Sequence, residues 1–447
     1  MEMTFADFIL QHASDDPVRL LLSRDKYPDI DIDLAVTTLE VRRKLRTKVP
    51  EWYAVPSLIF PSRLSGEQCS SSETARYKAS LLTSVRREGT PSETASASLR
   101  PLPSQAMGPS LLSGRGWPEV SEGVPSLLRI ADLTGGMGVD CWAFAEVAEE
   151  VLYNEMQEGL AQATERNFKE LGVENVRFRN CRVEPGRVAE VLDGFWPDVI
   201  FLDPARRAED GRKVFLIEDC QPDVLTLLPE LFQAGRFVLL KLSPMADITM
   251  ACKRLSHVRE VHVVAAGGEC KELLFLLDRD WDGPHATYVV EGGSVMAVPG
   301  QTGNEGDAPV IPGEAKESFS CLFEPGKALL KAGAFGLPSG RYGLTKLGTH
   351  THLYVGEMVP EELRPFGKSF EILEILPLNN RTLKEAGKRY PQAEVTARNI
   401  PMTSDLLRKK LGCASGGDVH LFGVRVDAAA DPGNYLIITK CQTYGND

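Results

Sequence analysis

The segment FLDPARRAED, Phe201 to Asp210, places an acid directly after an apolar run. Asp203 and Pro204 end that run, and Arg206 follows two residues after the proline. Asp-Pro is a common turn opener, so the pair alone fits an ordinary surface turn. A carboxylate at the end of a buried strand can also accept a proton from a reacting group. The choice between turn and catalytic loop depends on what else reaches the same place.

A glycine-rich turn follows an earlier apolar run, in IADLTGGMGVD. Glycines let the backbone turn tightly and approach a ligand closely. The order D-x-x-x-G-x-G differs from the dinucleotide fingerprint G-x-G-x-x-G. The candidate ligand-binding residues of this turn are Asp132, Thr134, Gly135, Gly136, Gly138 and Asp140.

The next apolar run, in VLYNEM, ends in Glu155, whose carboxylate can accept both hydroxyls of a ribose. Asp140 or Asp132 can hold an ammonium group. A ribose, an amino-acid head and no phosphate to cradle are the features of S-adenosylmethionine. In open α/β sheets, ligands lie beyond the carboxyl ends of the strands. These side chains are therefore expected around one S-adenosylmethionine pocket.

The elements that position these residues alternate between short apolar runs and amphipathic stretches. The runs are LLRIADL, EVLYNE, NVRFRN, DVIFLD, RFVLLKL, VREVHVV and ELLFLLD. Helix-like segments separate the first six, which predicts a parallel sheet covered on both faces. Only AAGGECK joins the last two, so the seventh strand is expected to be antiparallel. The fold class is α/β and Rossmann-like.

In this order, the glycine turn, the acid after strand two, the Asp-Pro after strand four and the final hairpin resemble the class I S-adenosylmethionine-dependent methyltransferases. The resemblance covers 127–279. Beyond it, EQCSSSETARYKA, FEPGKALLKAGAF, ARNIPMTSDLLRKKLG and GGDVHLF resemble a bacterial family of such enzymes. Its members carry a methyltransferase core, a short ferredoxin-like piece and a C-terminal THUMP-like domain. Because THUMP domains of other enzymes recognise RNA, the resemblance implies an RNA substrate, tRNA or rRNA.

The resemblance also assigns roles to the Asp-Pro site. Enzymes that methylate exocyclic amines of bases read Asp/Asn/Ser-Pro-Pro-aromatic here. Asp203 and Pro204 match, whereas Ala205 and Arg206 depart. An arginine plane can still stack on a base. Pyrimidine C5 enzymes read Asp-Pro-Pro-Arg and need a cysteine, but the end of strand five, KLSPMAD, has no thiol. Transfer to a nitrogen is therefore expected, with a ribose hydroxyl as the alternative.

Two further cofactor contacts are expected outside these motifs. Asn180 follows strand three, where class I enzymes place a polar residue against the adenine amine, and Cys181 and Arg182 compete for that role. Lys78, like Arg76, lies in a polar segment that a serine is expected to cap near Ser71 or Ser72. Both cations suit the cofactor carboxylate, RNA or a solvated helix face.

The domain boundaries follow composition. We expect a helical N-terminal region over 1–82, a Ser/Pro/Gly-rich linker or insertion over 83–126 and the methyltransferase domain over 127–279. A ferredoxin-like piece with a low-complexity insertion is expected over 280–320, and the THUMP-like domain over 321–447. Nine dispersed cysteines and the absence of a signal peptide favour the cytoplasm. No apolar run is long enough to predict a membrane span.

Charge separates the possible partners. The chain carries a net charge of −12, which argues against a broadly basic nucleic-acid surface. The stretch from Arg381 to Gly412 reverses this sign locally, with eight bases against three acids, as phosphate contacts or a solvated helix would require. We expect no metal, no DNA and no membrane partner. A methyltransferase for protein or small molecules, and a non-catalytic RNA-binding protein, remain the alternatives.

Overall fold

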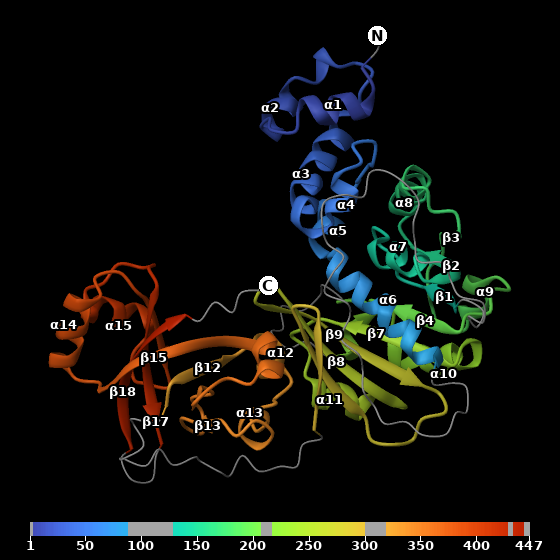
Figure 1. Cartoon of the computed structure of the whole chain (residues 1–447). Helices are drawn as coiled ribbons and strands as arrows, with labels where there is room; N and C mark the ends of the chain where they lie inside the picture. Colours follow the sequence, from blue (N-terminus) through green and yellow to red (C-terminus); the bar gives the residue numbers. More distant parts are fainter. Residues whose placement is uncertain (1–2, 88–127, 207–216, 300–318, 428–431, 442–447) are drawn as a thin grey trace. The chain divides into compact units, whose positions relative to one another are not determined.

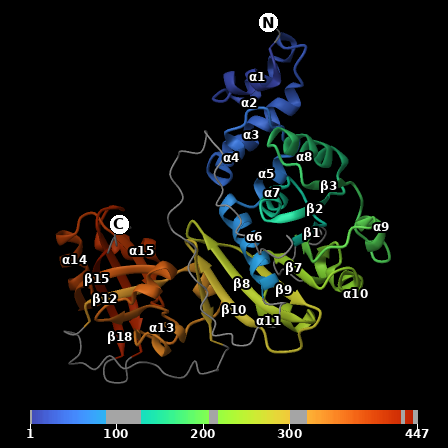
Figure 2. The same cartoon turned by 45° about the vertical axis from the view of Figure 1, so that its right-hand side comes forward.

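The computed structural model describes residues 3–87, 128–206, 217–299, 319–427 and 432–441 of the 447-residue chain. These residues form two compact units. The first comprises Met1–Val261 and Glu272–His285, and the second comprises His262–Lys271 and Ala286–Asp447. Figures 1 and 2 show the helices of the first unit in blue and green and the C-terminal strands of the second in orange and red.

The N-terminal part of the first unit is helical, as expected. Local side chains define the helix starts: Asp16 caps a helix with proline in its first turn, and Ser71 Oγ accepts a hydrogen bond from Thr74 N at 3.2 Å at the start of α6. The helices are α1 (Phe5–Gln11), α2 (Pro17–Leu22), η1 (Arg24–Lys26), α3 (Ile32–Lys48), α4 (Pro50–Tyr53), α5 (Arg63–Gln68) and α6 (Ser72–Arg87).

A mostly parallel sheet follows, in the order β8-β9-β7-β4-β1-β2-β3. The strands β1, β2, β3, β4 and β7 are parallel, whereas β9 is antiparallel to β7, which confirms the expected arrangement. Their bounds are β1 (Leu128–Asp132), β2 (Ala148–Asn154), β3 (Val176–Arg179), β4 (Val199–Leu202), β7 (Phe237–Leu242), β8 (Val258–Ala266) and β9 (Glu269–Asp278). The central strand β4 is buried along its whole length.

Helices connect these strands, as a parallel sheet requires. They are α7 (Val139–Ala145), α8 (Glu158–Glu170), α9 (Val188–Leu192), α10 (Val224–Ala234) and α11 (Ile248–Arg254), with η2 (Ile217–Asp219) before α10. A two-stranded ladder, β5 (Ala205–Arg206) with β6 (Cys220–Gln221), follows β4. Helix α6 packs against α7, so the N-terminal helices border the first turn of the sheet.

The second unit contains a hairpin of β10 (Ala286–Glu291) and β11 (Ser294–Val298) and a seven-stranded sheet in the order β13-β14-β12-β15-β18-β17-β16. The strands of that sheet are β12 (Cys321–Pro325), β13 (Thr345–Lys346), β14 (Tyr354–Gly356), β15 (Gly367–Pro377), β16 (Glu394–Arg398), β17 (Val419–Val426) and β18 (Gly433–Cys441). Its helices are α12 (Lys327–Lys331), α13 (Leu337–Gly340), η4 (Glu361–Phe366), α14 (Asn380–Arg389) and α15 (Ser404–Leu411).

Several boundaries differ from those expected. Helix α6 continues to Arg87 rather than ending at 82, and most of the expected linker lies outside the described residues. The segment GGSVMAV, interpreted as low complexity, forms the turn and second strand of a hairpin, because Gly292 and Gly293 adopt positive φ angles of 56° and 76°. No helix in the described ranges is long and apolar enough to cross a membrane.

Candidate functional site

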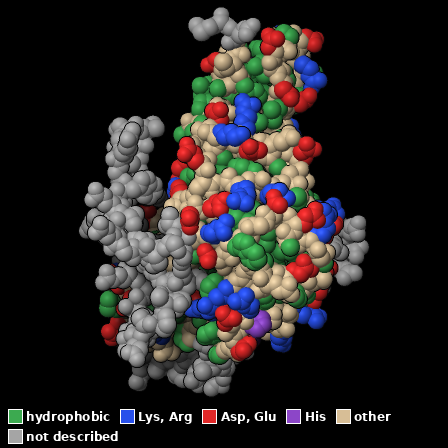
Figure 3. Space-filling model, turned by 90° about the vertical axis from the view of Figure 1, so that its right-hand side faces the viewer, with side chains coloured by type: hydrophobic (Ala, Val, Ile, Leu, Met, Phe, Trp, Pro, Cys, Tyr) green, Lys and Arg blue, Asp and Glu red, His purple; other side chains and the backbone are tan. Residues whose placement is uncertain are grey.

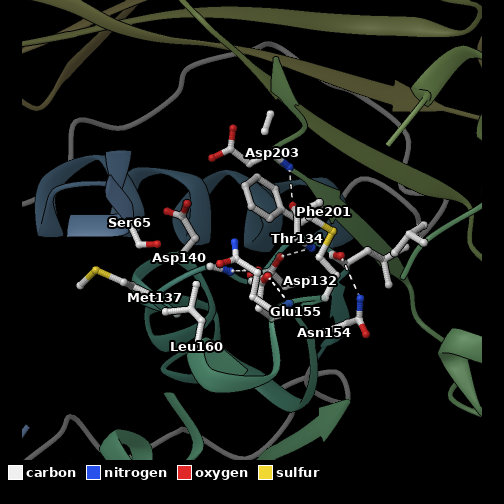
Figure 4. Close-up of a pocket in the computed structure, with 18 of the residues that line it drawn as sticks. Ser65, Asp132, Thr134, Met137, Asp140, Asn154, Glu155, Leu160, Phe201 and Asp203 are labelled. Atoms are coloured by element: carbon white, nitrogen blue, oxygen red, sulfur yellow. Dashed lines mark hydrogen bonds between the residues drawn. The ribbon is translucent and has the colours of Figure 1, made fainter. Parts of the chain in front are cut away.

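A cavity of about 200 Å³ lies in the first unit at the carboxyl ends of β1, β2 and β4. The glycine turn, the segment after β2, the residues after β3 and the Asp-Pro turn all line it. Figure 4 shows Asp132, Asp140, Glu155 and Asp203 gathered around this pocket. The strand ends that the sequence predicted to meet therefore do meet.

Two glycines of the turn are required by close packing. A Cβ at Gly135 would lie 2.1 Å from Tyr153 Cε2. Gly138 has a φ of 86°, and a Cβ there would lie 2.7 Å from Thr164 Cγ2. At Gly136, which also has a positive φ, nothing described lies closer than 3.9 Å to such a Cβ. The turn is thus packed on its protein side at two glycines and open at the third.

Asp132, at the end of β1, is fully buried, and one of its two carboxylate oxygens has a hydrogen-bond partner among the described residues. Its Oδ1 accepts a hydrogen bond from Thr134 N at 3.1 Å. Its Oδ2 is buried with no hydrogen-bond partner among the described residues. Burial raises the pKa of this carboxyl well above its ordinary value, and the nearby negative charge of Asp140 raises it further. A buried acceptor without a donor, in the wall of a cavity, suits a cationic ligand group.

Glu155 is fixed by the backbone around it. Its Oε2 accepts a hydrogen bond from Gly136 N at 3.0 Å, and its Oε1 accepts one from Gln157 N at 2.8 Å. Because each carboxylate oxygen has two acceptor sites, both oxygens retain capacity for a hydroxyl donor. The expected ribose-binding acid therefore lines the pocket in a fixed orientation.

Asn180 does not line the pocket. Its side-chain amide donates to the carbonyl of Glu155 at 2.6 Å, which turns it toward the backbone that follows β2. The cavity wall here consists of Cys181, Arg182 and Val183, the first two of which were the competing candidates. Asn154 also lines the pocket and was not predicted.

The Asp-Pro turn is joined directly to the glycine turn. Asp203 N donates a hydrogen bond to Thr134 Oγ1 at 2.6 Å, so the ends of β4 and β1 are held together. Asp203 and Ala205 line the pocket, whereas Pro204 is buried and does not. Arg206 belongs to β5 through its backbone, and its side chain lies outside the described part of the structure. Its predicted role in base stacking therefore stays a prediction.

Lys241, at the end of β7, lines the pocket and was missed from the sequence. Its Nζ lies 2.5 Å from Asp203 Oδ2 and 3.8 Å from Asp140 Oδ2, and its side chain is only 12% exposed. Burial alone would lower the pKa of Lys241, but the carboxylates of Asp203 and Asp140 outweigh it, so its pKa is raised. The pocket thus contains a lysine that stays charged near neutral pH.

Asp140 connects this lysine to a second one. Its Oδ2 accepts a hydrogen bond from Ser70 Oγ at 2.8 Å, and its Oδ1 lies 3.2 Å from Lys78 Nζ. Burial raises the pKa of Asp140, but attraction to Lys78 and Lys241 outweighs burial, so the pKa is lowered. Asp140 is therefore an ionised carboxylate, in contrast to the neighbouring Asp132.

Lys78 lies behind the pocket wall and does not line it. Its side chain is fully buried, and its Nζ donates to Glu272 Oε1 at 2.6 Å. Burial raises the pKa of Glu272 despite this lysine. The structure thus places Lys78 in a buried ion pair within the first unit rather than on a ligand, and it does not support the expected contact with the cofactor carboxylate.

The N-terminal helices supply part of the pocket wall, through Ser65, Gln68, Cys69 and Ser70. In EQCSSSETARYK the sequence pointed to the cations and not to these side chains. Cys69, like Cys181, brings a thiol to the pocket wall, although the end of strand five has none. Burial raises the pKa of the Cys69 thiol, so this thiol is a poorer nucleophile than an ordinary cysteine.

The basic stretch of the second unit divides into paired and unpaired cations. Arg381, Arg389, Arg398 and Arg408 form ion pairs with acids. The lysines of α14 and α15 are exposed and form no ion pair with the described residues; they are Lys384, Lys388, Lys409 and Lys410. On the face drawn in Figure 3, by contrast, acidic and basic side chains are interspersed. The two helices pack together, so their lysines lie on one part of the molecule.

Comparisons with known proteins agree with this architecture. A family model described as a THUMP-like domain matches 367–440, and one described as a ferredoxin-like domain matches 322–363. The second match lies after the range expected for the ferredoxin-like piece, 280–320. The two matched segments share one sheet, because β12 pairs with β15. No curated protein matches the chain.

Among solved structures, a "putative methyltransferase" from Porphyromonas gingivalis W83 matches with a TM-score of 0.76 and 28% identity, over 99% of this chain and 98% of that one. An rRNA methylase from Streptococcus thermophilus matches with a TM-score of 0.25 and 14% identity, over 34% of this chain and 87% of that one. A ribosomal protein L11 methylase from Lactobacillus delbrueckii subsp. bulgaricus matches with a TM-score of 0.25 and 17% identity, over 35% and 72%. From the match to the Porphyromonas gingivalis structure and the THUMP-like family model, the chain combines a class I methyltransferase fold with a C-terminal THUMP-like domain.

Proposed function

We propose that this protein is an S-adenosylmethionine-dependent methyltransferase that methylates a nitrogen of a base in structured RNA, either tRNA or rRNA. The observation that carries the proposal is the position of Asp203. Its carboxylate lines the same pocket as the glycine turn, and its backbone N–H is bonded to Thr134 of that turn. Asp203, the candidate proton acceptor, and the glycine turn, the candidate cofactor-binding segment, therefore line one cavity.

The residues of the pocket fit S-adenosylmethionine. The Oδ2 of Asp132, which has no partner among the described residues, suits the ammonium of the amino-acid head, and the fixed carboxylate of Glu155 suits the ribose hydroxyls. The open space beside Gly136 allows a ligand to approach the backbone. Cys181, Arg182 and Val183 provide the wall where an adenine would lie.

The chemistry required of the protein is modest. When bound, S-adenosylmethionine supplies a methyl group on a sulfonium, which an acceptor nitrogen takes as the C–S bond breaks and S-adenosylhomocysteine leaves. Asp203 accepts the proton that the acceptor loses and orients the nitrogen. General bases of this kind contribute about 10²- to 10⁴-fold in rate.

The second unit supports RNA as the substrate. Its THUMP-like match and the four exposed lysines on α14 and α15 suit a phosphate backbone. Lysine contacts to phosphate fix the position of an RNA without reading its sequence. The choice of nucleotide then depends on the pocket of the first unit.

The direct test uses purified full-length protein with methyl-labelled S-adenosylmethionine and, separately, tRNA, rRNA and protein from a strain that lacks the gene. We expect label in RNA and none in protein. Label in protein alone would contradict the proposal and favour a protein methyltransferase.

The Asp203→Ala variant tests the assigned site. We expect a loss of about 10²- to 10⁴-fold in methyl transfer, with S-adenosylmethionine affinity by calorimetry unchanged within a few fold. Asp282→Ala is the matched control, because Asp282 has a side chain that is 93% exposed. Full transfer by Asp203→Ala would exclude Asp203 as the proton acceptor, and no cofactor binding by the wild type would favour a non-catalytic RNA-binding protein.

A further inference from the structure

The acceptor end of the pocket presents a carboxylate and a cation side by side. Asp203 Oδ2 lies 2.5 Å from Lys241 Nζ, and both residues line the cavity. Among the described residues, Lys241 has Ser70 Oγ at 3.4 Å as its other hydrogen-bond partner. A lysine ammonium has three N–H donors, so it retains one for a ligand. The pair therefore offers an acceptor and a charged donor to the same substrate.

We propose that Asp203 and Lys241 together select a ring N–H that lies beside a carbonyl, as in N1–H and C6=O of guanine or N3–H and C4=O of uracil. In this arrangement Asp203 accepts from the N–H and Lys241 donates to the adjacent oxygen. This inference rests on the proposed function and specifies its acceptor. It makes Lys241 a residue that touches substrate.

An exocyclic amine fits this pair less well. An amine presents two N–H groups and requires acceptors for both. Here Lys241 already takes one acceptor site of Asp203 Oδ2, and this buried cation beside the amine offers a donor where a second acceptor is needed. A buried donor left without an acceptor is unfavourable. In a lactam, by contrast, the carbonyl oxygen accepts a hydrogen bond from the Lys241 ammonium.

The pair also supplies what a lactam nitrogen needs for methylation. Such a nitrogen has no free lone pair until it loses its proton. Asp203 takes the proton, the negative charge that develops on the carbonyl oxygen lies against the Lys241 ammonium, and the nitrogen lone pair forms the N–C bond. The C–S electron pair stays on sulfur, so S-adenosylhomocysteine leaves with a neutral thioether. The proton on Asp203 returns to water after product release.

The environment of Lys241 keeps it suited to this task. Its side chain is 12% exposed, and the ionised carboxylate of Asp140 lies 3.8 Å from its Nζ, which favours the charged ammonium. A preorganised donor to a developing oxyanion is worth about 10²- to 10³-fold in kcat. Lys241 thus has the charge and the fixed position that such a donor requires.

The first experiment identifies the product. Purified full-length protein is incubated with labelled S-adenosylmethionine and bulk tRNA or rRNA from a strain lacking the gene, and the RNA is digested for nucleoside mass spectrometry. We expect label in 1-methylguanosine or 3-methyluridine. Label in an exocyclic amine, a ribose or a ring carbon would overturn the inference and leave RNA methylation standing. No labelled RNA nucleoside at all would overturn both.

The second experiment uses Lys241→Met and Lys241→Arg, with Lys253→Met as control because Lys253 is exposed on α11. We expect Lys241→Met to lower kcat about 10²- to 10³-fold, with KM changed only a few fold and activity partly regained as pH rises, since alkali ionises the lactam without help. Lys241→Arg should restore part of kcat.

A loss of equal size at every pH, or a parallel loss of S-adenosylmethionine affinity by calorimetry, would assign Lys241 a structural role and refute the inference. If Lys241→Met does not fold, the comparison of Lys241→Arg with wild type across the pH profile decides instead. The identity of the methylated nucleoside is independent of both variants.

Discussion

Replacing Lys78 by methionine should destabilise the first unit strongly. Lys78 is fully buried, and its Nζ lies 2.6 Å from Glu272 Oε1 and 3.2 Å from Asp140 Oδ1. Methionine has a similar length and no charge, so the main effect of the substitution is electrostatic. Asp140 would retain Ser70 and Lys241, whereas Glu272 would lose the single hydrogen-bond partner that the described residues give its side chain.

The expected cost follows from the burial of this pair. Removing one partner of a buried ion pair costs about 3–5 kcal/mol, because an uncompensated charge stays out of water. The exposed Lys169 provides a matched control, since its pair with Glu165 at 2.9 Å is 73% exposed on the lysine side. Lys169→Met should cost about 0.3–0.5 kcal/mol.

Tryptophan fluorescence in urea measures this cost selectively. The four tryptophans that the structure describes belong to the first unit, so their emission follows the unfolding of the part that holds Lys78; they are Trp52, Trp142, Trp196 and Trp281. The double variant Lys78→Met/Glu272→Met should be more stable than Lys78→Met alone, because replacing both members of a buried pair by apolar groups is often neutral.

The pH dependence gives a second check. Burial raises the pKa of Glu272, and a raised folded-state pKa stabilises the protein at low pH and loses that contribution as pH rises through it. Without Lys78 the pKa of Glu272 should rise further. The difference in unfolding free energy between the wild type and Lys78→Met should therefore become smaller in mild acid. A loss of unfolding free energy below about 1 kcal/mol in Lys78→Met, or a loss that becomes larger in acid, would refute this account of the buried pair.

Three other predictions follow from the site and the second unit. Because burial and the charge of Asp140 raise the pKa of Asp132, binding of the cationic cofactor should release a proton; calorimetry in buffers of different ionisation enthalpy should detect it, and Asp132→Asn should abolish it. Gly138→Ala should weaken S-adenosylmethionine binding and stability by more than Gly172→Ala, because both have positive φ but only the first Cβ meets neighbouring atoms. Lys409→Gln with Lys410→Gln should weaken RNA binding uniformly across sequences, and the slope of affinity against salt should fall by about one for each of these lysines that binds a phosphate.

The parts of the site that the sequence predicted are those encoded locally. The glycine turn and the Asp-Pro turn each follow an apolar strand, and parallel strands bring their carboxyl ends to one edge. Asp132, Glu155 and Asp203 therefore line one pocket, as expected. The packing of Gly135 against Tyr153 explains sterically why the glycine turn needs a glycine at this position, which the spacing of the motif alone does not show.

The parts that the sequence missed depend on contacts between distant segments. Lys241 lies 38 residues from Asp203, and Ser70 lies 70 residues from Asp140. Asn180 was assigned from its place after a strand, but its side chain donates to the Glu155 carbonyl, 25 residues away in the sequence. Lys78 was assigned to a ligand or to solvent, and neither choice anticipated a buried partner in β9.

A charged residue inside an apolar run indicates that it has a buried partner, but the sequence does not show which residue that partner is. Lysine and glutamate are rarely fully buried unless they are paired. FVLLKL places a lysine near the end of a buried strand, ELLFLLD places an acid at each end of its apolar run, and neither run identifies the partners of these charges. The structure divides these charges into a structural pair, Lys78 with Glu272, and a pair in the pocket, Lys241 with Asp203. Asp140 lies near both lysines, so its replacement should reduce both stability and methyl transfer. Replacement of Lys78 should mainly reduce stability, whereas replacement of Lys241 should mainly reduce methyl transfer.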